Sequence, residues 1–254
     1  MTPTTTTDTE AARCGLHLVL LPGMDGTGDL FAPLVEALSD TFTLQVVRYP
    51  VDQAANYEDL VSIVRAVLPR DRPYMLLGES FSGPIAVTLA AEAPVGLQGL
   101  VLCCSFVRNP QPWLAWLRPL VGLVPVKAMP LRGLAWFLLG RASNAARRSA
   151  LAQALAQVSP AAMRARLRAV LAVDVSAAWV RVNVPTLCLR ATEDRVVPAA
   201  VSRLVTALMK PTTQVVELRG PHFLLQVAPL EAAQAICAFV RSLPGHPEPE
   251  ENQR

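Results

Sequence analysis

Ser80 stands at the centre of the stretch whose residue types best support chemistry. The apolar run Tyr74–Leu77 leads into Gly78–Gly83, which we call the elbow, and the segment 85–91 has the composition of a helix. A strand, a tight turn and a helix with a serine at the apex hold the hydroxyl clear of the sheet in a strained backbone conformation. The sequence therefore predicts that Ser80 is a nucleophile at a sharp turn.

The elbow departs at one position from the usual G-x-S-x-G pattern. Ser82 takes the place of the last glycine, and Gly83 follows one step later. The positions two before and two after the nucleophile must be small, and Gly78 and Ser82 both meet that demand. The alternative is an ordinary strand-to-helix turn in which Ser80 caps the helix N-terminus.

A base and an acid with the expected chain order follow the elbow. A serine hydroxyl needs a base to take its proton, and a third group, normally a carboxylate, orients that base. His222 comes directly after the last strand-like run, and Asp194 comes directly after the run before it. Ser, acid and His in this order are expected behind a nucleophile elbow, so we predict that Ser80, Asp194 and His222 are catalytic. The alternatives are a helix-capping or core histidine at 222 and a helix N-cap at Asp194, which is compatible with catalysis.

Two backbone N–H groups are the predicted donors to an oxyanion. One belongs to Phe81, the residue after the serine, at a helix N-terminus. The other is expected from the glycine-rich loop 21–28, where we assign it to Met24. This loop has no G-x-G-x-x-G pattern and no Lys-Ser/Thr ending, which argues against phosphate binding.

Strand-like runs alternate with segments of helical spacing along most of the chain. The predicted strands are 16–21, 43–49, 74–77, 100–106, 186–191 and 214–218, and the predicted helices are 29–38, 57–68, 85–91, 199–208 and 230–240. Such alternation predicts an α/β fold with a mostly parallel, doubly wound sheet covered on both faces. The ligand site of such a sheet lies at the carboxyl ends of its strands, where Ser80, Asp194 and His222 all fall.

A helical insert interrupts this alternation. Residues 107–178, which we call the insert, have helical signals of their own, including Ser159-Pro160 as an N-cap with proline at the first helical position. The predicted domains are a disordered lead (1–14), an α/β core (15–106 and 179–243), a helical cap or lid (107–178) and a disordered tail (244–254). Large apolar side chains in the insert predict a substrate pocket, and the candidates are Trp113, Trp116, Trp136 and Phe137.

Composition excludes several other classes of protein. No stretch approaches the ~20 apolar residues of a membrane span, and residues 1–10 do not have the pattern of a signal peptide. We therefore expect a cytoplasmic protein with no transmembrane segment. Five cysteines without C-x-x-C spacing and three scattered histidines predict neither a disulfide framework nor a metal site, and no cofactor is expected.

At these residues the chain resembles the α/β-hydrolase family. LPGMDGTG together with GESFSG is similar to the esterase, lipase and thioesterase group, and the layout resembles carboxylesterases that demethylate pimeloyl-carrier esters. The resemblance covers about residues 16–240 and implies an α/β-hydrolase fold whose first two antiparallel strands are absent or reduced. It also implies that Ser80 is the nucleophile, that Asp194 and His222 form its relay, and that Phe81 and Met24 supply the oxyanion donors.

The insert has an unusual charge. It contains ten basic residues and one acidic residue, and nine of the ten are arginine, whose planar fork suits phosphate and carboxylate. We predict that Arg147, Arg148, Arg164 and Arg168 attract an anionic partner, either an acyl carrier protein or a coenzyme A thioester. The alternatives are a solvated surface without function and an anionic membrane surface; nucleic acid is not expected, because stacking aromatics do not interleave the basic residues.

The predicted activity is hydrolysis of aliphatic carboxylic esters through an acyl-enzyme. A thioesterase or an acyltransferase would use the same residues. The alternative outside the enzymes is a non-catalytic α/β-hydrolase-like protein that uses the pocket to bind a small molecule.

Overall fold

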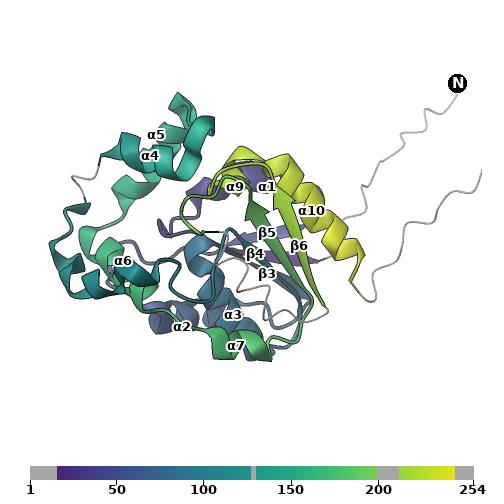
Figure 1. The fold of residues 1–254 in the computed structure, drawn as a ribbon. Helices are drawn as coiled ribbons and strands as arrows, with labels where there is room; N and C mark the ends of the chain where they lie inside the picture. Colours follow the sequence, from purple (N-terminus) through teal and green to yellow (C-terminus); the bar gives the residue numbers. More distant parts are fainter. Residues whose placement is uncertain (1–15, 127–129, 199–211, 244–254) are drawn as a thin grey trace, which may run out of the picture.

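The computed structural model describes residues 16–126, 130–198 and 212–243. Its centre is one sheet of six parallel strands in the order β2-β1-β3-β4-β5-β6 (Figure 1). The strands are β1 (His17–Leu21), β2 (Thr43–Val46), β3 (Tyr74–Glu79), β4 (Leu97–Cys103), β5 (Thr186–Ala191) and β6 (Thr213–Leu218). The predicted α/β fold with a parallel sheet is confirmed.

Helices cover both faces of the sheet, because successive side chains of a strand point to opposite faces. In β1, Val19 and Leu21 pack toward α2 (Tyr57–Val67), α3 (Gly83–Ala91) and α7 (Ser176–Arg181). Leu18 and Leu20 pack toward the other layer, which consists of α1 (Ala32–Leu38), α9 (Leu224–Val227) and α10 (Pro229–Arg241). The central strands are apolar on both sides, as buried parallel strands are.

Two strands end earlier than their apolar runs predict. The run 43–49 ends as a strand at Val46. The Val47 N–H still bonds to the Leu20 carbonyl of β1, but the Tyr49 N–H bonds to the Gly26 carbonyl of a loop instead. The run 100–106 ends as a strand at Cys103, because Cys104 turns the chain with a φ of 47°. In both segments the apolar composition continues past the last strand residue, so the composition did not indicate where the strand ends.

The order of the strands places the site at one edge of the sheet. The chain runs from β1 to β2 on one side and then returns to add β3 on the other side of β1. Loops at such a reversal leave a crevice beyond the carboxyl ends of the strands. Leu21 pairs with Gly78, so the loop after β1 and the elbow after β3 start side by side.

The insert leaves the core after β4 and returns before β5. It contains η3 (Pro112–Leu123), α4 (Leu131–Leu139), η5 (Gly140–Ala142), α5 (Ala145–Gln157) and α6 (Pro160–Ala172), and α4, α5 and α6 gather to one side of the sheet (Figure 1). As predicted, Ser159 caps α6 ahead of Pro160, and its hydroxyl accepts from the Ala162 N–H at 3.1 Å.

The two chain segments that join the insert to the core lie next to each other. Arg108 and Asp174 form an antiparallel bridge and an ion pair of 3.0 Å. The Asn109 N–H bonds to the Val173 carbonyl at 2.9 Å, and the Val175 N–H bonds to the Val107 carbonyl at 2.8 Å. We call these paired segments the neck.

The predicted helix 199–208 and the predicted disorder of 1–14 and 244–254 lie outside the described residues. Among the helices that the structure describes, none has the length and apolarity needed to span a bilayer.

Candidate active site

Ser80 occupies a strained turn between β3 and α3, as predicted. Its φ is 47°, a left-handed conformation that costs about 1–3 kcal/mol in a residue with a side chain. Gly78 allows the turn, because a Cβ there would lie 2.9 Å from Ala86 Cβ. Ser105, in the loop after β4, donates to the Ser80 carbonyl at 2.6 Å and so holds the apex from a neighbouring strand end.

Ser80, His222 and Asp194 come together although they are distant in sequence. Ser80 Oγ lies 2.7 Å from His222 Nε2, and His222 Nδ1 lies 2.9 Å and 3.0 Å from the two carboxylate oxygens of Asp194. Both the imidazole and the carboxylate are buried. This geometry can take a proton from the serine hydroxyl and stabilise the imidazolium that forms.

Backbone groups fix the orientation of the Asp194 carboxylate. Its Oδ1 accepts from the N–H groups of Val196 and Val197 at 2.8 and 2.9 Å. The loops after β5 and β6 also bond to each other, since the Glu193 N–H donates to the Gly220 carbonyl. Asp194 therefore caps the following turn and faces His222 at the same time, as the sequence allowed.

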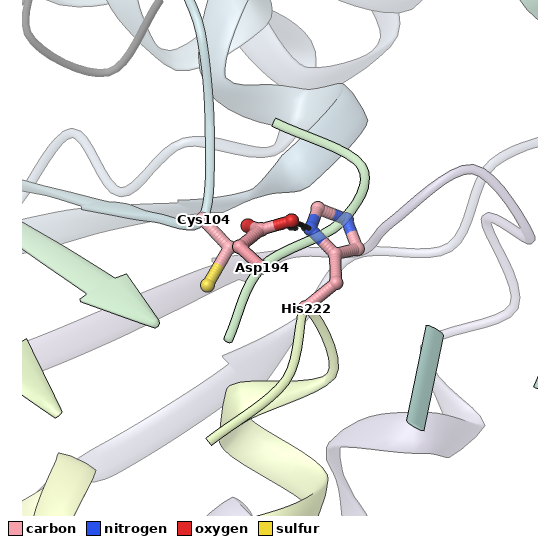
Figure 2. Close-up of side chains that lie close together, drawn as sticks. All are labelled: Cys104, Asp194 and His222. Carbon is pink, nitrogen blue, oxygen red and sulfur yellow. Dashed lines mark hydrogen bonds and ion pairs between the residues drawn. The ribbon is translucent and has the colours of Figure 1, made fainter. Parts of the chain in front are cut away.

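Cys104 lies beside this pair, an arrangement that the sequence did not indicate. Figure 2 shows its thiol next to Asp194, with His222 on the far side of the carboxylate. One ligand atom from each of the three residues lies within 4.8 Å of the others, and a thiolate, a carboxylate and an imidazole are ligands that Zn²⁺ accepts. A metal bound to Nδ1 and the carboxylate would replace the hydrogen bond between His222 and Asp194.

The loop after β1 is tied to the elbow by Ser82. Its buried hydroxyl donates to the Pro22 carbonyl and accepts from Tyr49 Oη at 2.6 Å. The residue that departs from the glycine pattern therefore connects the loop with Met24 to the turn with Phe81. The predicted oxyanion donors belong to these two connected segments, and their catalytic role remains a prediction.

Glu79 is a buried carboxyl next to Ser80 in sequence. It accepts from Gln226 Nε2 at 2.8 Å and from the backbone of Gly23. Burial raises the pKa of Glu79 to about 7, and the hydrogen bond from Gln226 works in the opposite direction. Sequence reasoning missed this group, because nothing in the elbow pattern indicates that its side chain is buried.

The four apolar residues predicted for the pocket lie on the surface. Trp113 and Trp116 are each 69% exposed, Trp136 is 59% exposed, and Phe137 is 42% exposed. The guanidinium of Arg195 lies 4.0 Å from the centroid of the Trp136 ring. Contact between these side chains and a substrate remains a prediction.

A groove of about 810 Å³ lies between α2 and α6, and Ser80, Asp194 and His222 do not line it. Alanine and valine side chains of α6 and the neck form much of its wall. Arg118 and Arg168 also line the groove. Tyr57 connects the groove to the elbow, since its ring stacks on Phe81 at 4.8 Å and its hydroxyl donates to the Phe81 carbonyl at 3.0 Å.

Three of the four arginines predicted to bind a partner have contacts inside the protein. Arg147 donates to the carbonyls of Ala142 and Gln226. Arg148 donates weakly to Ser143, at 3.4 Å, and Arg164 donates to the Val124 carbonyl at 3.1 Å. The fourth, Arg168, is exposed beside the groove.

The family model described as "Alpha/beta hydrolase family" matches residues 7–236 of this chain. Solved structures of similar fold include a bromoperoxidase from Bacillus anthracis (TM-score 0.76, 17% identity, 89% of this chain and 92% of that chain). They also include an esterase from Exiguobacterium antarcticum (TM-score 0.75, 15% identity, 90% and 92%) and an enol-lactonase from Burkholderia xenovorans (TM-score 0.72, 17% identity, 89% and 91%). At these identities the likeness shows the fold alone.

One curated relative shares sequence with this chain. Phytyl ester synthase 1, a chloroplastic protein of Arabidopsis thaliana, is 35% identical over 118 residues. The aligned residues make up 42% of this chain but 16% of the relative, so this chain matches only a small part of that protein.

Proposed function

Because this chain belongs to the alpha/beta hydrolase family, we propose that it is a serine hydrolase that cleaves carboxylic esters of aliphatic acids through an acyl-enzyme. The observation that carries the proposal is the chain of contacts from Ser80 Oγ through His222 to Asp194, with distances of 2.7 and 2.9 Å. A general base must lie within about 2.6–3.2 Å of the atom whose proton it takes, and His222 Nε2 lies in this range of Ser80 Oγ. The contact between His222 and Asp194 is a hydrogen bond that orients the imidazole.

In the first step, Ser80 Oγ attacks the ester carbonyl carbon while its proton passes to His222 Nε2. Asp194 stabilises the resulting imidazolium. The carbonyl oxygen becomes an oxyanion, which accepts hydrogen bonds from the N–H groups of Phe81 and Met24. When the C–O bond to the alcohol breaks, the alcohol takes the proton from Nε2, and the acyl group stays on Ser80.

In the second step, water attacks the acyl carbon and gives its proton to His222. The bond to Ser80 Oγ breaks, the carboxylic acid leaves, and the serine recovers its proton. The same machinery forms an ester when an alcohol replaces water. The sequence shared with a protein named as a phytyl ester synthase supports acyl transfer to an alcohol as the second candidate.

A series of p-nitrophenyl esters with acyl chains from acetyl to palmitoyl tests this function. We expect the wild type to hydrolyse the series and Ser80→Ala to lose at least about 10⁴-fold in kcat. Ser149→Ala removes an exposed hydroxyl on α5 and should retain full activity. Equal rates for the wild type and Ser80→Ala would contradict the proposal and favour the non-catalytic binding protein.

A second measurement separates hydrolysis from transfer. The preferred acyl group is supplied as an oxygen ester and as a coenzyme A thioester, each with and without a long-chain alcohol, and the products are identified by mass. Free acid as the main product in every case supports the hydrolase. A long-chain ester as the main product in the presence of the alcohol would instead assign the acyltransferase.

A further inference from the structure

Arg166 is a buried arginine that reaches from the insert into the loop after β1. It lies on α6, its exposed fraction is 1%, and it is the largest fully buried side chain in the described residues. Its Nη1 donates to the carbonyls of Met24 and Asp25 at 2.8 and 2.7 Å, and its Nη2 donates to the Pro50 carbonyl at 2.9 Å. One guanidinium thus holds three backbone carbonyls from two loops.

The surroundings of Arg166 compensate the buried charge. The Asp25 carboxylate is itself buried and attracts the guanidinium. The ring of Tyr49 lies 5.9 Å from the guanidinium carbon, within the range of a cation–π contact. A Cβ on Gly26 would lie 2.7 Å from Nη1, so the loop closes directly over the guanidinium.

These contacts fix both sides of the Met24 N–H group. Upstream, Ser82 donates to the Pro22 carbonyl. Downstream, Arg166 binds the carbonyls of Met24 and Asp25. The Met24 N–H lies between these two anchors. The guanidinium binds the two adjacent carbonyls through Nη1 and the Pro50 carbonyl of the other loop through Nη2, a fixed planar arrangement that a single ammonium group does not provide.

We propose that Arg166 is a positioning residue that holds the Met24 N–H toward the oxyanion formed at Ser80. This inference rests on the proposed serine hydrolase function. Because Arg166 belongs to the insert, it also means that the oxyanion donor is in place only when α6 is seated against the loop after β1. The insert then contributes to the chemical step.

The test compares Arg166→Lys and Arg166→Met with Arg181→Met. Arg181 is the control, because it is an exposed arginine of α7, outside the insert, and donates to the Ala177 carbonyl of its own helix. A fluorophosphonate counts active sites in each preparation, so kcat refers to folded enzyme only. A trifluoromethyl ketone, which forms an oxyanion on the serine, reports on the donors directly.

We expect Arg166→Met to lose about 10²–10³-fold in kcat per titrated site, the effect of removing one oxyanion donor. KM should stay within about threefold, and affinity for the trifluoromethyl ketone should fall in parallel with kcat. Arg166→Lys keeps the charge but not the fork, so it should lose part of the rate. Arg181→Met should match the wild type in all three quantities. If Arg166→Met does not fold, kcat and trifluoromethyl ketone affinity of Arg166→Lys alone test the inference.

Two results would overturn the inference while leaving the proposed function intact. One is an Arg166 variant with wild-type kcat per titrated site. The other is a loss of rate without any change in affinity for the trifluoromethyl ketone, which would indicate an ordinary structural role. A wild type that neither hydrolyses esters nor reacts with the fluorophosphonate at Ser80 would instead refute the proposed function.

Discussion

Buried charged side chains lie in the segments around Ser80. Asp25, Glu79 and Arg166 are all buried, and they belong to the loop after β1, the elbow and α6. Charged residues are rarely buried unless they are paired or hydrogen-bonded, and each of these has such partners. The residues that support Ser80 are therefore coupled to one another through electrostatics as well as packing.

Glu79 should make stability depend on pH. Its pKa is 4.5 when unfolded and about 7 in the folded protein, so the folded protein binds more protons between these values. The free energy of unfolding that Glu79 contributes is therefore fully present below pH 4.5 and lost as pH rises through 7. The loss is roughly 3 kcal/mol at about 1.4 kcal/mol per pKa unit.

Urea unfolding of Glu79→Gln across pH 4.5–8.5 checks this expectation. The variant keeps a polar group for Gln226 but does not ionise, so its stability should fall less over this range than that of the wild type. Glu92→Gln removes an exposed carboxylate paired with Arg65 and is the control. A slope in Glu79→Gln as steep as in the wild type would mean that the carboxyl titrates normally.

Sequence patterns indicated some residues of the site and not others. Ser80, Asp194 and His222 were predictable, because chain order and strand ends constrain them. Arg166 was not singled out, although Met163, Arg166 and Val170 share one helical face and an arginine on an apolar face was a usable signal. Tyr49 and Ser105 have no local signal at all, because their roles arise from contacts between distant segments.

The elements around the elbow pack without spare room. A Cβ on Gly83, at the start of α3, would lie 1.7 Å from Ser105 Oγ. Gly83 is therefore needed so that α3 can approach the loop after β4. The elbow pattern predicts small residues at positions 78 and 82. The structure shows that position 83 must be small as well, because α3 approaches Ser105 there.

Gly83→Ala should destabilise the protein by at least about 1–3 kcal/mol, because an overpacked site must shift its backbone. It should also lower kcat, since Ser105 holds the Ser80 carbonyl. The control is Gly133→Ala in α4, where the nearest atom would be Pro130 Cγ at 3.7 Å. This change should be neutral or stabilise by up to about 1 kcal/mol, as Gly-to-Ala changes in exposed helices do.

Thermal unfolding and kcat of both alanine variants check this expectation. Equal stability of the two variants would show that an added methyl group fits at position 83, which contradicts the expectation.

Strand positions were largely predictable, and strand ends were not. Apolar runs in alternation with helical spacing located all six strands of the described sheet. The ends of β2 and β4 depend on a loop contact at Tyr49 and on the left-handed backbone of Cys104. Neither feature changes the apolar character of the two runs, so the apolar pattern could not show where these strands end.

On the scale of the whole molecule, the insert is the most positively charged part of the chain. Ten of its residues are basic and one is acidic. Several arginines are used internally, but Arg118 and Arg168 are exposed at the groove beside α6. We expect this surface to attract anionic substrates through long-range electrostatics.

A comparison of anionic and neutral esters of the same acyl group tests this expectation. Between 20 and 300 mM salt, kcat/KM should fall by about threefold or more for the anionic ester only, because salt screens exposed charges. The double variant Arg118→Glu/Arg168→Glu should lower kcat/KM for the anionic ester and remove its salt dependence. Arg70→Glu, before β3 at the opposite end of the sheet, is the control. The same salt response for both esters would argue against steering.

The neck is where the chain enters and leaves the insert. Since residues 107 and 175 are hydrogen-bonded neighbours, the chain between them could be exchanged for another helical module without altering the order of the strands. Such a graft would inherit Ser80, Asp194 and His222 unchanged, as all three lie outside it. It would not inherit Arg166. On the role that we propose for Arg166, a transplanted module would need its own cation at that point, and we expect the choice of module to change kcat.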